Sequence, residues 1–330
     1  METKNIKPLV AEPGIQEILR AGEIIHPFVN ATPVLTCSSF NALLESTLFF
    51  KCENFQKAGS FKIRGASHAL ALLGNTVKTK GVCTHSSGNH AQALSLAAKM
   101  LGFNAHIVMP NNSANVKIEA VHSYGGKITF CNPTLQDREA TLKKVQEKTG
   151  ATLIHPFNDY SIIAGQATAA LELIREHNTL DYIIAPVGGG GLLSGTILAA
   201  KYFSPNTKVI GAEPSQANDA FQSFNLKYFV PSVNPQTIAD GLRTSLGALT
   251  WPIIRNGASD VLIASESSIV SAMKLIWERM KILVEPSGVL PFAVMLENQS
   301  MFKGKKVGLI ISGGNIDLNK IPWCEDLSSK

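Results

Sequence analysis

The hydrophobic positions of this chain form short apolar runs that alternate with longer amphipathic segments. Short apolar runs are typical of buried strands, and we expect strands at 48–52, 82–85, 105–109, 128–131, 153–155, 182–187, 209–212, 261–264 and 307–311. Helical periodicity predicts helices at 89–101, 135–148, 164–177, 192–203 and 267–280. Alternating strands and helices indicate an α/β fold whose parallel sheets are covered by helices.

Three of the expected strands run directly into turns of small and polar residues. The turns are Ser86-Ser87-Gly88-Asn89-His90 after strand 82–85, Gly188-Gly189-Gly190-Gly191 after strand 182–187, and Ser312-Gly313-Gly314-Asn315 after strand 307–311. In open parallel sheets, ligands bind at the carboxyl ends of the strands, near helix N-termini. We therefore expect the three turns to form one composite site.

The four consecutive glycines leave the backbone N–H groups bare, with a helix N-terminus behind them. This arrangement is typical of a phosphate cradle, and the alternative is a flexible turn that binds nothing. The pattern is neither G-x-G-x-x-G nor G-x-x-x-x-G-K-[ST], so NAD and the transfer of phosphoryl groups from ATP are disfavoured. The turn favours another ligand that carries a phosphate.

A lysine lies between two apolar residues in Gly59-Ser60-Phe61-Lys62-Ile63-Arg64-Gly65-Ala66, at an expected helix start. In partly apolar surroundings a lysine loses its proton more readily and becomes a nucleophilic amine. Taken alone, such a position more often carries a solvated lysine at the edge of a helix. Together with a phosphate cradle, it meets the two needs of pyridoxal phosphate (PLP), a lysine for a Schiff base and a grip on the phosphate.

The lysine segment and the three turns occur in the order and spacing of a known family. The sequence resembles the fold-type II PLP enzymes, in the branch of the serine racemases and the serine/threonine dehydratases, from Thr32-Pro33-Val34-Leu35 to Asp317-Leu318. The resemblance implies two open parallel-sheet domains with the cofactor between them. Residues 1–79 and 156–330 would form the larger PLP-binding domain, and residues 80–155 a smaller inserted domain that closes onto the substrate.

The resemblance also implies roles around the cofactor. Lys62 would carry PLP, Phe61 would pack beside its ring, and Asn89 would bond its 3′-oxygen. The phosphate would be held by the four glycines, Gly188, Gly189, Gly190 and Gly191. Ser312 would face the pyridine nitrogen, and a neutral hydroxyl does not keep that nitrogen protonated as a carboxylate does. The ring would then be a mild electron sink.

On the substrate side, the resemblance implies a set of polar residues that bind an amino acid such as serine or threonine. These residues are Ser86, Ser87, Asn89, His90, Arg138 and Thr244. Thr244 departs from the pattern, because animal serine racemases have a serine there. For Arg138, the alternative is an exposed arginine on a helix.

Ser87 is the residue that the resemblance places opposite Lys62 across the cofactor. Ser86-Ser87 precedes Gly-Asn-His as in eukaryotic serine racemases, whereas many dehydratases have an alanine at one of these positions. Two serines before a helix also act as caps, which stays open for Ser86. With Lys62 and Ser87 as the catalytic pair, we expect racemisation of serine, together with elimination of water from serine to give pyruvate and ammonia.

Other activities remain as alternatives. An L-serine/L-threonine dehydratase with little racemisation is the first of them. A cysteine or cystathionine synthase is disfavoured, because the serine-bearing turn differs from the threonine-rich loop of those enzymes. A non-catalytic binding protein would have lost Lys62 or the glycine turn, and both are present.

Two acidic residues after the strand at 209–212 suggest a metal site. Glu213 and Asp219 are six residues apart, and hard cations such as Mg²⁺, Mn²⁺ or Ca²⁺ take all-oxygen ligand sets. Taken alone, the two carboxylates are more typical of a solvated turn. The resemblance to the racemases implies Glu213, Ala217 (through its carbonyl) and Asp219 as ligands of a structural or activating ion.

Several animal members of the family form homodimers that ATP activates at the interface, and we expect a homodimer here. The residues that match the nucleotide site are Lys57, Gln92, Tyr124, Lys281 and Asn315. Cys37 and Ala58 replace hydroxyl residues of that site, which puts activation by ATP in doubt.

Composition disfavours nucleic acid as a partner and favours a cytoplasmic location. The net charge of +5 comes with no basic run longer than a pair, which disfavours nucleic acid as a partner. No segment of about 18 apolar residues and no secretory signal is evident, so we expect no membrane span and a cytoplasmic location. The five cysteines are widely spaced and predict reduced thiols, three of them buried in strands, rather than disulfides.

Overall fold

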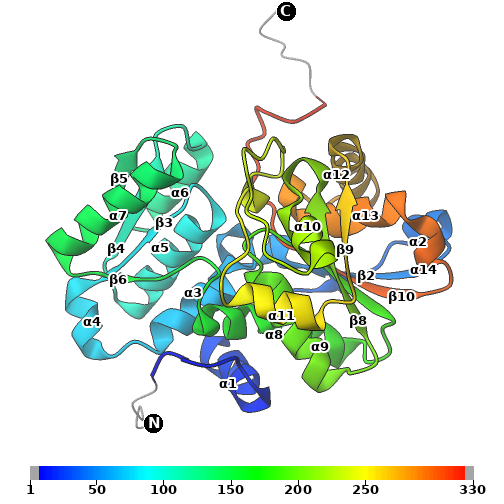
Figure 1. The fold of residues 1–330 in the computed structure, drawn as a ribbon, viewed down its shortest axis with the longest axis horizontal. Helices are drawn as coiled ribbons and strands as arrows, with labels where there is room; N and C mark the ends of the chain where they lie inside the picture. Colours follow the sequence, from blue (N-terminus) through cyan, green and yellow to red (C-terminus); the bar gives the residue numbers. More distant parts are fainter. Residues whose placement is uncertain (1–6, 324–330) are drawn as a thin grey trace, which may run out of the picture.

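The computed structural model describes residues 7–323 and contains two sheets flanked by helices (Figure 1). The larger sheet has the strand order β1-β2-β10-β7-β8-β9. Its strands are β1 (Val34–Leu35), β2 (Thr47–Cys52), β10 (Lys306–Ile311), β7 (Tyr182–Pro186), β8 (Lys208–Pro214) and β9 (Asp260–Ala264). All neighbours are parallel except β1 and β2, so the expected parallel fold is confirmed with one short antiparallel edge.

The smaller sheet is fully parallel and has the order β5-β4-β3-β6. Its strands are β3 (Val82–His85), β4 (Ala105–Pro110), β5 (Lys127–Cys131) and β6 (Thr152–Leu153). We call residues 80–155, which carry this sheet, the small-sheet unit; it forms the left part of Figure 1. Its limits as a domain remain a proposal, because its apolar core also includes Ile63 and Leu70 of α3 and Ile162 of α8.

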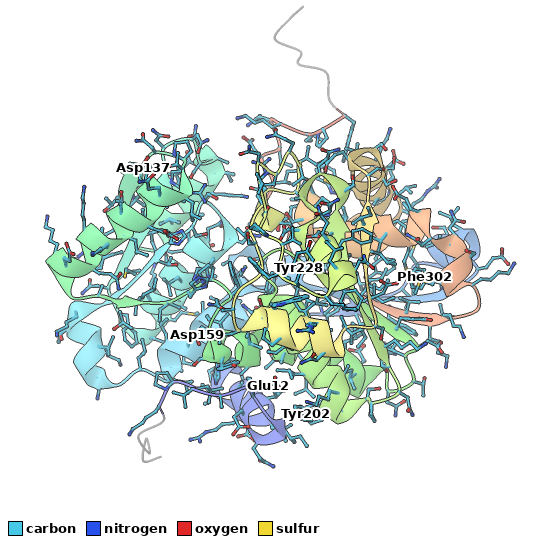
Figure 2. All side chains as sticks on the ribbon, viewed as in Figure 1. Glu12, Asp137, Asp159, Tyr202, Tyr228 and Phe302 are labelled. Carbon is cyan, nitrogen blue, oxygen red and sulfur yellow. The ribbon has the colours of Figure 1, made fainter. Side chains whose placement is uncertain are left out.

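Helices follow nearly every strand, as the alternating pattern predicts. They are α1 (Ile15–Ile25), α2 (Ser38–Leu44), α3 (Lys62–Ala71), α4 (Asn75–Lys80), α5 (Asn89–Leu101), α6 (Asn115–Ser123), α7 (Leu135–Thr149), α8 (Tyr160–Glu176), α9 (Gly191–Phe203), α10 (Asp219–Leu226), α11 (Thr250–Gly257), α12 (Glu266–Met280), α13 (Leu290–Glu297) and α14 (Gln299–Phe302). Asp137, near the start of α7, and Phe302 of α14 mark opposite sides of the molecule (Figure 2).

Among the element boundaries that differ from the periodicity, two have a clear local reason. Helix α8 starts four residues before the expected position, because the carboxylate of Asp159 caps it by accepting from the backbone N–H of Ser161 at 2.7 Å. Strand β6 ends at Leu153, before the expected 155, because the chain turns at His155, whose Nδ1 accepts from the N–H of Asn158 at 2.9 Å.

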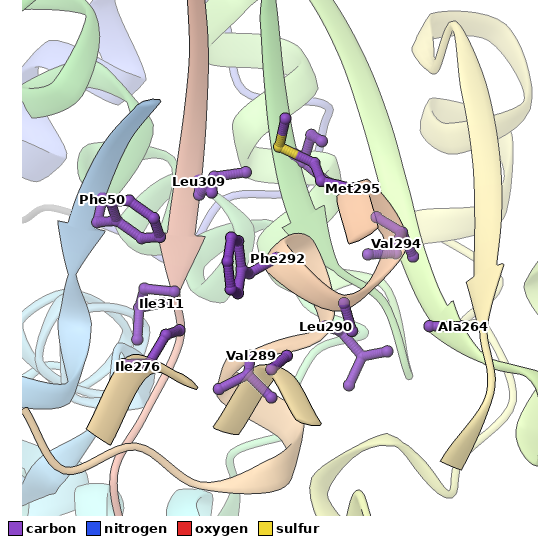
Figure 3. Close-up of a cluster of buried hydrophobic side chains, with 14 of the residues drawn as sticks. Phe50, Ala264, Ile276, Val289, Leu290, Phe292, Val294, Met295, Leu309 and Ile311 are labelled. Carbon is purple, nitrogen blue, oxygen red and sulfur yellow. The ribbon is translucent and has the colours of Figure 1, made fainter. Parts of the chain in front are cut away.

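The core of the larger sheet is built around the apolar helix α13 (Figure 3). Its Phe292 is fully buried, with its ring centroid 4.6 Å from that of Phe40 and 5.9 Å from that of Phe50. Helix α13 has no polar face, so periodicity does not reveal it as a helix. The buried helix packs against β7, β8, β9 and β10.

Membrane-spanning helices and disulfides are both absent from the described residues. No helix between residues 7 and 323 is long and apolar enough to cross a membrane. Cys52, Cys83 and Cys131 are buried free thiols and Cys37 is a half-buried one, while Cys324 lies outside the described residues.

Candidate active site

The three turns lie close together at the carboxyl ends of β3, β7 and β10. The backbone N–H of Phe61 donates to the carbonyl of Ser312 at 3.0 Å, which joins the lysine segment to the third turn. The Asn315 amide donates to Oδ1 of Asn89 at 3.1 Å, which joins the third turn to the first. A Cβ on Gly189 would lie 2.2 Å from the ring of Phe157, so the second turn packs against the segment that follows His155.

Helix α3, which begins at Lys62, is fixed by a buried ionic network. Arg64 donates to both carboxylate oxygens of Glu53, from Nε at 2.7 Å and from NH2 at 2.8 Å, and to Glu172 at 2.6 Å. Lys51 completes the network with an ion pair of 2.6 Å to Glu172. Burial alone would raise the pKa of Glu53, but the charge and hydrogen bonds of Arg64 outweigh it and lower this pKa. The network holds the start of α3 in place.

Lys62 extends its ammonium into the space between the turns. Its Nζ donates to the carbonyl of Pro156 at 3.0 Å and lies 5.1 Å from the centre of the Phe61 ring. Burial lowers the pKa of Lys62 to about 8, although the carboxylate of Glu285 opposes the shift. A lysine with this pKa supplies a neutral amine near physiological pH, as a nucleophile or a base requires.

Two histidines near Lys62, His90 and His155, have lowered pKa values that favour the neutral imidazole. Burial, with the charges of His85 and Lys62 adding to it, lowers the pKa of His155 to about 4. Burial and the charge of Lys62 also lower the pKa of His90, whose Nε2 lies 3.3 Å from the carbonyl of Ile154. Neutral imidazoles add no second cation beside Lys62, and each can still donate or accept a hydrogen bond.

Asn89 is held by two side chains from outside the small-sheet unit. Its Nδ2 donates to Oε1 of Glu285 at 2.6 Å, and its Oδ1 accepts from Asn315. Burial raises the pKa of Glu285 to about 7, while Lys117 and the Asn89 bond lower it and Asp240 raises it. One hydrogen of the Asn89 amide is left for a ligand oxygen.

The glycine turn fits an anion. Among the residues the structure describes, none of the N–H groups of Gly188, Gly189, Gly190 and Gly191 donates a hydrogen bond to the protein. Gly190 caps α9 with φ of +89°, a left-handed conformation that favours glycine, and a Cβ on it would lie 2.8 Å from Oγ1 of Thr250. Free amides at the start of a 13-residue helix are a site for a phosphate group.

The predicted serines lie in the turns with different surroundings. Ser312 is buried, and its hydroxyl donates to the carbonyl of Ser287 at 3.5 Å. Ser86 accepts from the N–H of Gly88 at 3.3 Å, a bond within the turn; Gly88 is the N-cap of α5 and no side chain caps this helix, so the capping alternative for Ser86 is wrong. Ser87 lies half-buried between β3 and α5.

Arg138 and Thr244 are less closely tied to Lys62. Arg138, in the first turn of α7, is half-buried, and its charge lowers the pKa of His85, so the two side chains lie near each other. The buried Nε of Arg138 has no hydrogen-bond partner among residues 7–323. Thr244 is exposed, and no described contact joins it to the three turns.

Glu213 and Asp219 form a buried acidic pair at the start of α10, where Glu213 accepts from the N–H groups of Ala220 and Phe221 at 2.9 and 2.8 Å. Burial and the charge of Asp219 raise the pKa of Glu213 well above its usual value, and burial raises that of Asp219 to about 6. Neither Asp219 oxygen meets hydrogen-bond geometry, and the Ala217 carbonyl accepts no described hydrogen bond. Hydrogen bonds from Ser232 and from the backbone of Asp219 and Leu246 still act to lower the pKa of Asp219. Carboxylate and carbonyl oxygens are the ligand type that a hard cation takes.

The residues predicted to bind a nucleotide are only partly brought together. Asn315 donates to the carbonyl of Ala58 at 2.8 Å, beside Lys57, and α5, which carries the buried Gln92, contacts the same segment. Lys281 is exposed and, as the C-cap of α12, donates to the carbonyl of Glu278 in that helix. No contact described for Tyr124 or Lys281 joins them to the other three.

Sequence reasoning missed Glu285, Lys117 and His155. His155 follows a predicted strand, so the rule that ligands bind at strand ends could have found it. Glu285 and Lys117 lie outside the strand-end turns, and nothing local to their sequence distinguishes them from solvated residues. Only the packing of the two sheets brings them to the site.

The chain is similar to known proteins over nearly all of its length. Residues 25–313 match the family model described as "Pyridoxal-phosphate dependent enzyme". The chain is 47% identical over 311 residues to a "beta-hydroxyaspartate dehydratase" of Paracoccus denitrificans (strain Pd 1222), covering 94% of this chain and 99% of that protein. It is 46% identical over 321 residues to a "Serine racemase" of Arabidopsis thaliana, covering 96% and 97%.

A solved structure of maize serine racemase superposes on the chain with a TM-score of 0.91 at 45% identity. The superposition covers 94% of this chain and 95% of the maize chain. The order of elements and the pairing of the two sheets are therefore those of a known architecture.

Proposed function

Because this chain belongs to the family of pyridoxal-phosphate dependent enzymes, among its racemases and ammonia-lyases, we propose that it interconverts L- and D-serine. We propose a second outcome in the same site, the elimination of water from serine to give pyruvate and ammonia. The observation that carries the proposal is a half-buried lysine of lowered pKa close to a turn of free glycine amides. An L-serine/L-threonine dehydratase with little racemisation is the alternative.

The residues present fit the cofactor. Gly188–191 would hold its phosphate, Asn89 its 3′-oxygen and Ser312 its ring nitrogen, with Lys62 as the residue that carries it. When bound, PLP withdraws electrons from the substrate and makes the proton on Cα acidic. The neutral hydroxyl of Ser312 would not keep the ring nitrogen protonated, so the ring would be a mild electron sink. Negative charge at Cα would then be short-lived.

Lys62 and Ser87 would move the proton. The neutral amine of Lys62 can take or return a proton on its own face of Cα, and its pKa of about 8 suits both directions. Ser87 would serve the opposite face, and Ser86 with His90 would position the substrate carboxylate at the N-terminus of α5. A base on each face gives racemisation, whereas one base with departure of the hydroxyl gives elimination.

Product analysis separates the two outcomes. Purified enzyme with PLP and L-serine should form D-serine and pyruvate, measured by chiral chromatography and by a coupled pyruvate assay. Pyruvate without D-serine would favour the dehydratase, and neither product would contradict serine as the substrate. A visible absorption band that borohydride removes would still report the cofactor in that case.

A second candidate substrate is 3-hydroxyaspartate, because Arg138 offers a cation with an unpartnered Nε near His85. A guanidinium binds a carboxylate by two parallel hydrogen bonds, so Arg138 could hold the side-chain carboxylate that serine lacks. The dehydratase of Paracoccus denitrificans, 47% identical, bears the name of this substrate. Elimination of water followed by hydrolysis would give oxaloacetate and ammonia.

Arg138→Gln should distinguish these substrates. We expect kcat/KM for 3-hydroxyaspartate to fall about 10- to 100-fold, in line with the loss of a charge-assisted hydrogen bond, while that for serine changes little. Oxaloacetate and pyruvate are measured with coupled dehydrogenases. An equal loss for both substrates would place Arg138 in general folding or closure, and no use of 3-hydroxyaspartate by the wild type would remove this candidate.

We also propose a divalent cation at Glu213, Asp219 and the carbonyl of Ala217. Burial raises the pKa of both carboxyl groups, and the charge of Asp219 raises that of Glu213 further; a bound cation would stabilise their charged forms, and Mg²⁺, Mn²⁺ and Ca²⁺ suit oxygen ligands. The ion would stabilise the start of α10, away from the proton transfers.

Removing this ion should lower the melting temperature of the wild type. An ion present at about 100 times its Kd stabilises the folded state by about 2.7 kcal/mol, so removing it with a chelator should lower the free energy of unfolding by that amount. Raised carboxyl pKa values mean that the folded state binds protons more tightly, so the chelated protein should also lose stability as pH rises from about 4 to 6. Differential scanning fluorimetry measures both effects.

Glu213→Gln with Asp219→Asn keeps the hydrogen-bond acceptors and removes both charges. Its melting temperature should respond to neither Mg²⁺ nor chelator. An equal response of this variant and the wild type would contradict the site.

The remaining expectations stay predictions. From the resemblance we expect a homodimer and activation by ATP, through Lys57, Gln92, Tyr124, Lys281 and Asn315. From the composition we expect a cytoplasmic location. The scattered positions of Lys281 and Tyr124 weigh against a complete nucleotide site within one chain.

A further inference from the structure

Lys117 is a buried cation that the proton-transfer scheme leaves without a role. It lies in the first turn of α6 and is only 5% exposed, and its Nζ forms an ion pair with Oδ2 of Asp240. Helix α6 belongs to the small-sheet unit, whereas Asp240 begins the short 3-10 helix Asp240–Leu242 in the rest of the chain. Among the ion pairs within residues 7–323, this is the one that joins the two parts.

The two partners contact opposite sides of the site. The Lys117 ammonium lies 3.3 Å from where a Cβ on Gly88 would be, so it packs on the turn that carries Ser87. The segment of Asp240 packs on the glycine turn, since a Cβ on Gly188 would lie 2.9 Å from the Cα of Leu242. The ion pair therefore connects the substrate-side turn with the phosphate-side turn.

The surroundings make Lys117 dependent on its partner. It lies beside the N-terminus of the 13-residue helix α5, whose dipole disfavours a nearby cation. Burial alone would lower the pKa of Lys117, but the carboxylates of Asp240 and Glu285 raise it above its usual value, against the charge of Arg243. Separation of Lys117 from Asp240 would leave the buried Lys117 ammonium unpaired. The free-energy cost of an unpaired buried charge is larger than the stabilisation that a solvent-exposed ion pair provides.

Asp240 faces the opposite situation, because its side chain is 45% exposed. It can return to water when the two parts separate, so the pair can open and close without trapping a second buried charge. Within residues 7–323, the other described side-chain hydrogen bonds between the small-sheet unit and the rest of the chain, apart from those at the chain junction beside His155, are those of Asn89 to Glu285 and Asn315. Helix α5 also packs on α3 and contacts the segment Lys57–Gly59, and the Lys78 ammonium lies 5.5 Å from the centre of the Phe103 ring. The apolar packing of α5 on α3 permits sliding.

We propose that the ion pair of Lys117 and Asp240 is a latch that closes the small-sheet unit over the bound amino acid. Lys117 is then a positioning residue that presses the turn of Ser86 and Ser87 towards Lys62. The inference rests on the proposed function in one respect, namely that the amino acid binds between this turn and Lys62. It adds that substrate affinity depends on a charge pair that need not touch the substrate.

The test compares Asp240→Asn and Lys117→Met with the control Lys303→Met. Lys303 pairs with Glu45 at 2.7 Å, but both side chains are more than 60% exposed, and the pair joins the ends of α14 and α2. Because only the closed form binds substrate well, each latch variant should raise KM roughly 5- to 30-fold with kcat retained. The double variant should show no more than the larger single effect, because both changes break one interaction. Lys303→Met should leave KM unchanged.

Hydrogen exchange of the cofactor-loaded protein without substrate gives a second readout. The amides of residues 86–90 should lose protection in both latch variants and keep it in Lys303→Met. Unchanged KM and unchanged exchange in Asp240→Asn would overturn the latch, as would an effect of Lys117→Met that Asp240→Asn does not share. If the wild type does not turn over serine, the proposed function fails, while the exchange experiment still decides the latch.

Discussion

Lys62→Ala should give a folded protein that lacks the borohydride-sensitive visible band and nearly all turnover. Lys62 is the residue proposed to carry the cofactor and also the proton carrier on one face of Cα, so both functions disappear together. The loss of the acid–base function alone is expected to cost on the order of 10²- to 10⁴-fold in rate. The measurements are the absorption spectrum, the initial rates from L- and D-serine, and the melting temperature.

Lys62→Arg is the matched control for charge. A guanidinium keeps a cation opposite Glu285 but stays protonated, so it serves neither as nucleophile nor as base. This variant should fold and still lack the band and the activity. Because burial disfavours the charged form of Lys62, Lys62→Ala is not expected to lower the melting temperature much, whereas Lys62→Arg keeps a permanent charge there and should lower it more. Turnover near the wild-type rate in Lys62→Ala would contradict the cofactor assignment.

Ser87→Ala should nearly abolish the interconversion of L- and D-serine in both directions. A racemase with two bases removes the proton on one face of Cα and returns one on the other, and Lys62 serves only its own face. Elimination from L-serine should survive, because Lys62 alone removes that proton before the hydroxyl departs. Elimination from D-serine should fall, since its proton faces the missing hydroxyl.

Ser86→Ala, one residue away, is the control in the same turn. Ser86 accepts from the N–H of Gly88, so its loss should weaken the turn and lower all four activities by a similar factor. Pyruvate and both enantiomers are measured from each starting enantiomer. An equal loss of all four activities in Ser87→Ala would make Ser87 a positioning residue, and retained racemisation would move the second base to another side chain.

The sequence predicts much of the molecule because the relevant signals are local. Strand β3 has the expected bounds, and so does helix α5, which starts after glycine and ends at Leu101 before the left-handed Gly102. The three turns could be placed at one edge because parallel strands share their carboxyl ends. Helix α13 escaped detection because an entirely buried helix has no polar face to give a period.

What the sequence by itself determined is the family, the α/β architecture and the order of the lysine segment and glycine turn, because each depends on residue type and short spacing. Only the tertiary structure decided the electrostatics of the site. The lowered pKa of Lys62 and the raised pKa of Glu285 arise from burial and from charges far apart in the chain. The ion pair of Lys117 with Asp240 spans 123 residues, and no local pattern encodes a contact at that separation. Such pairs form only when two separately built sheets pack together.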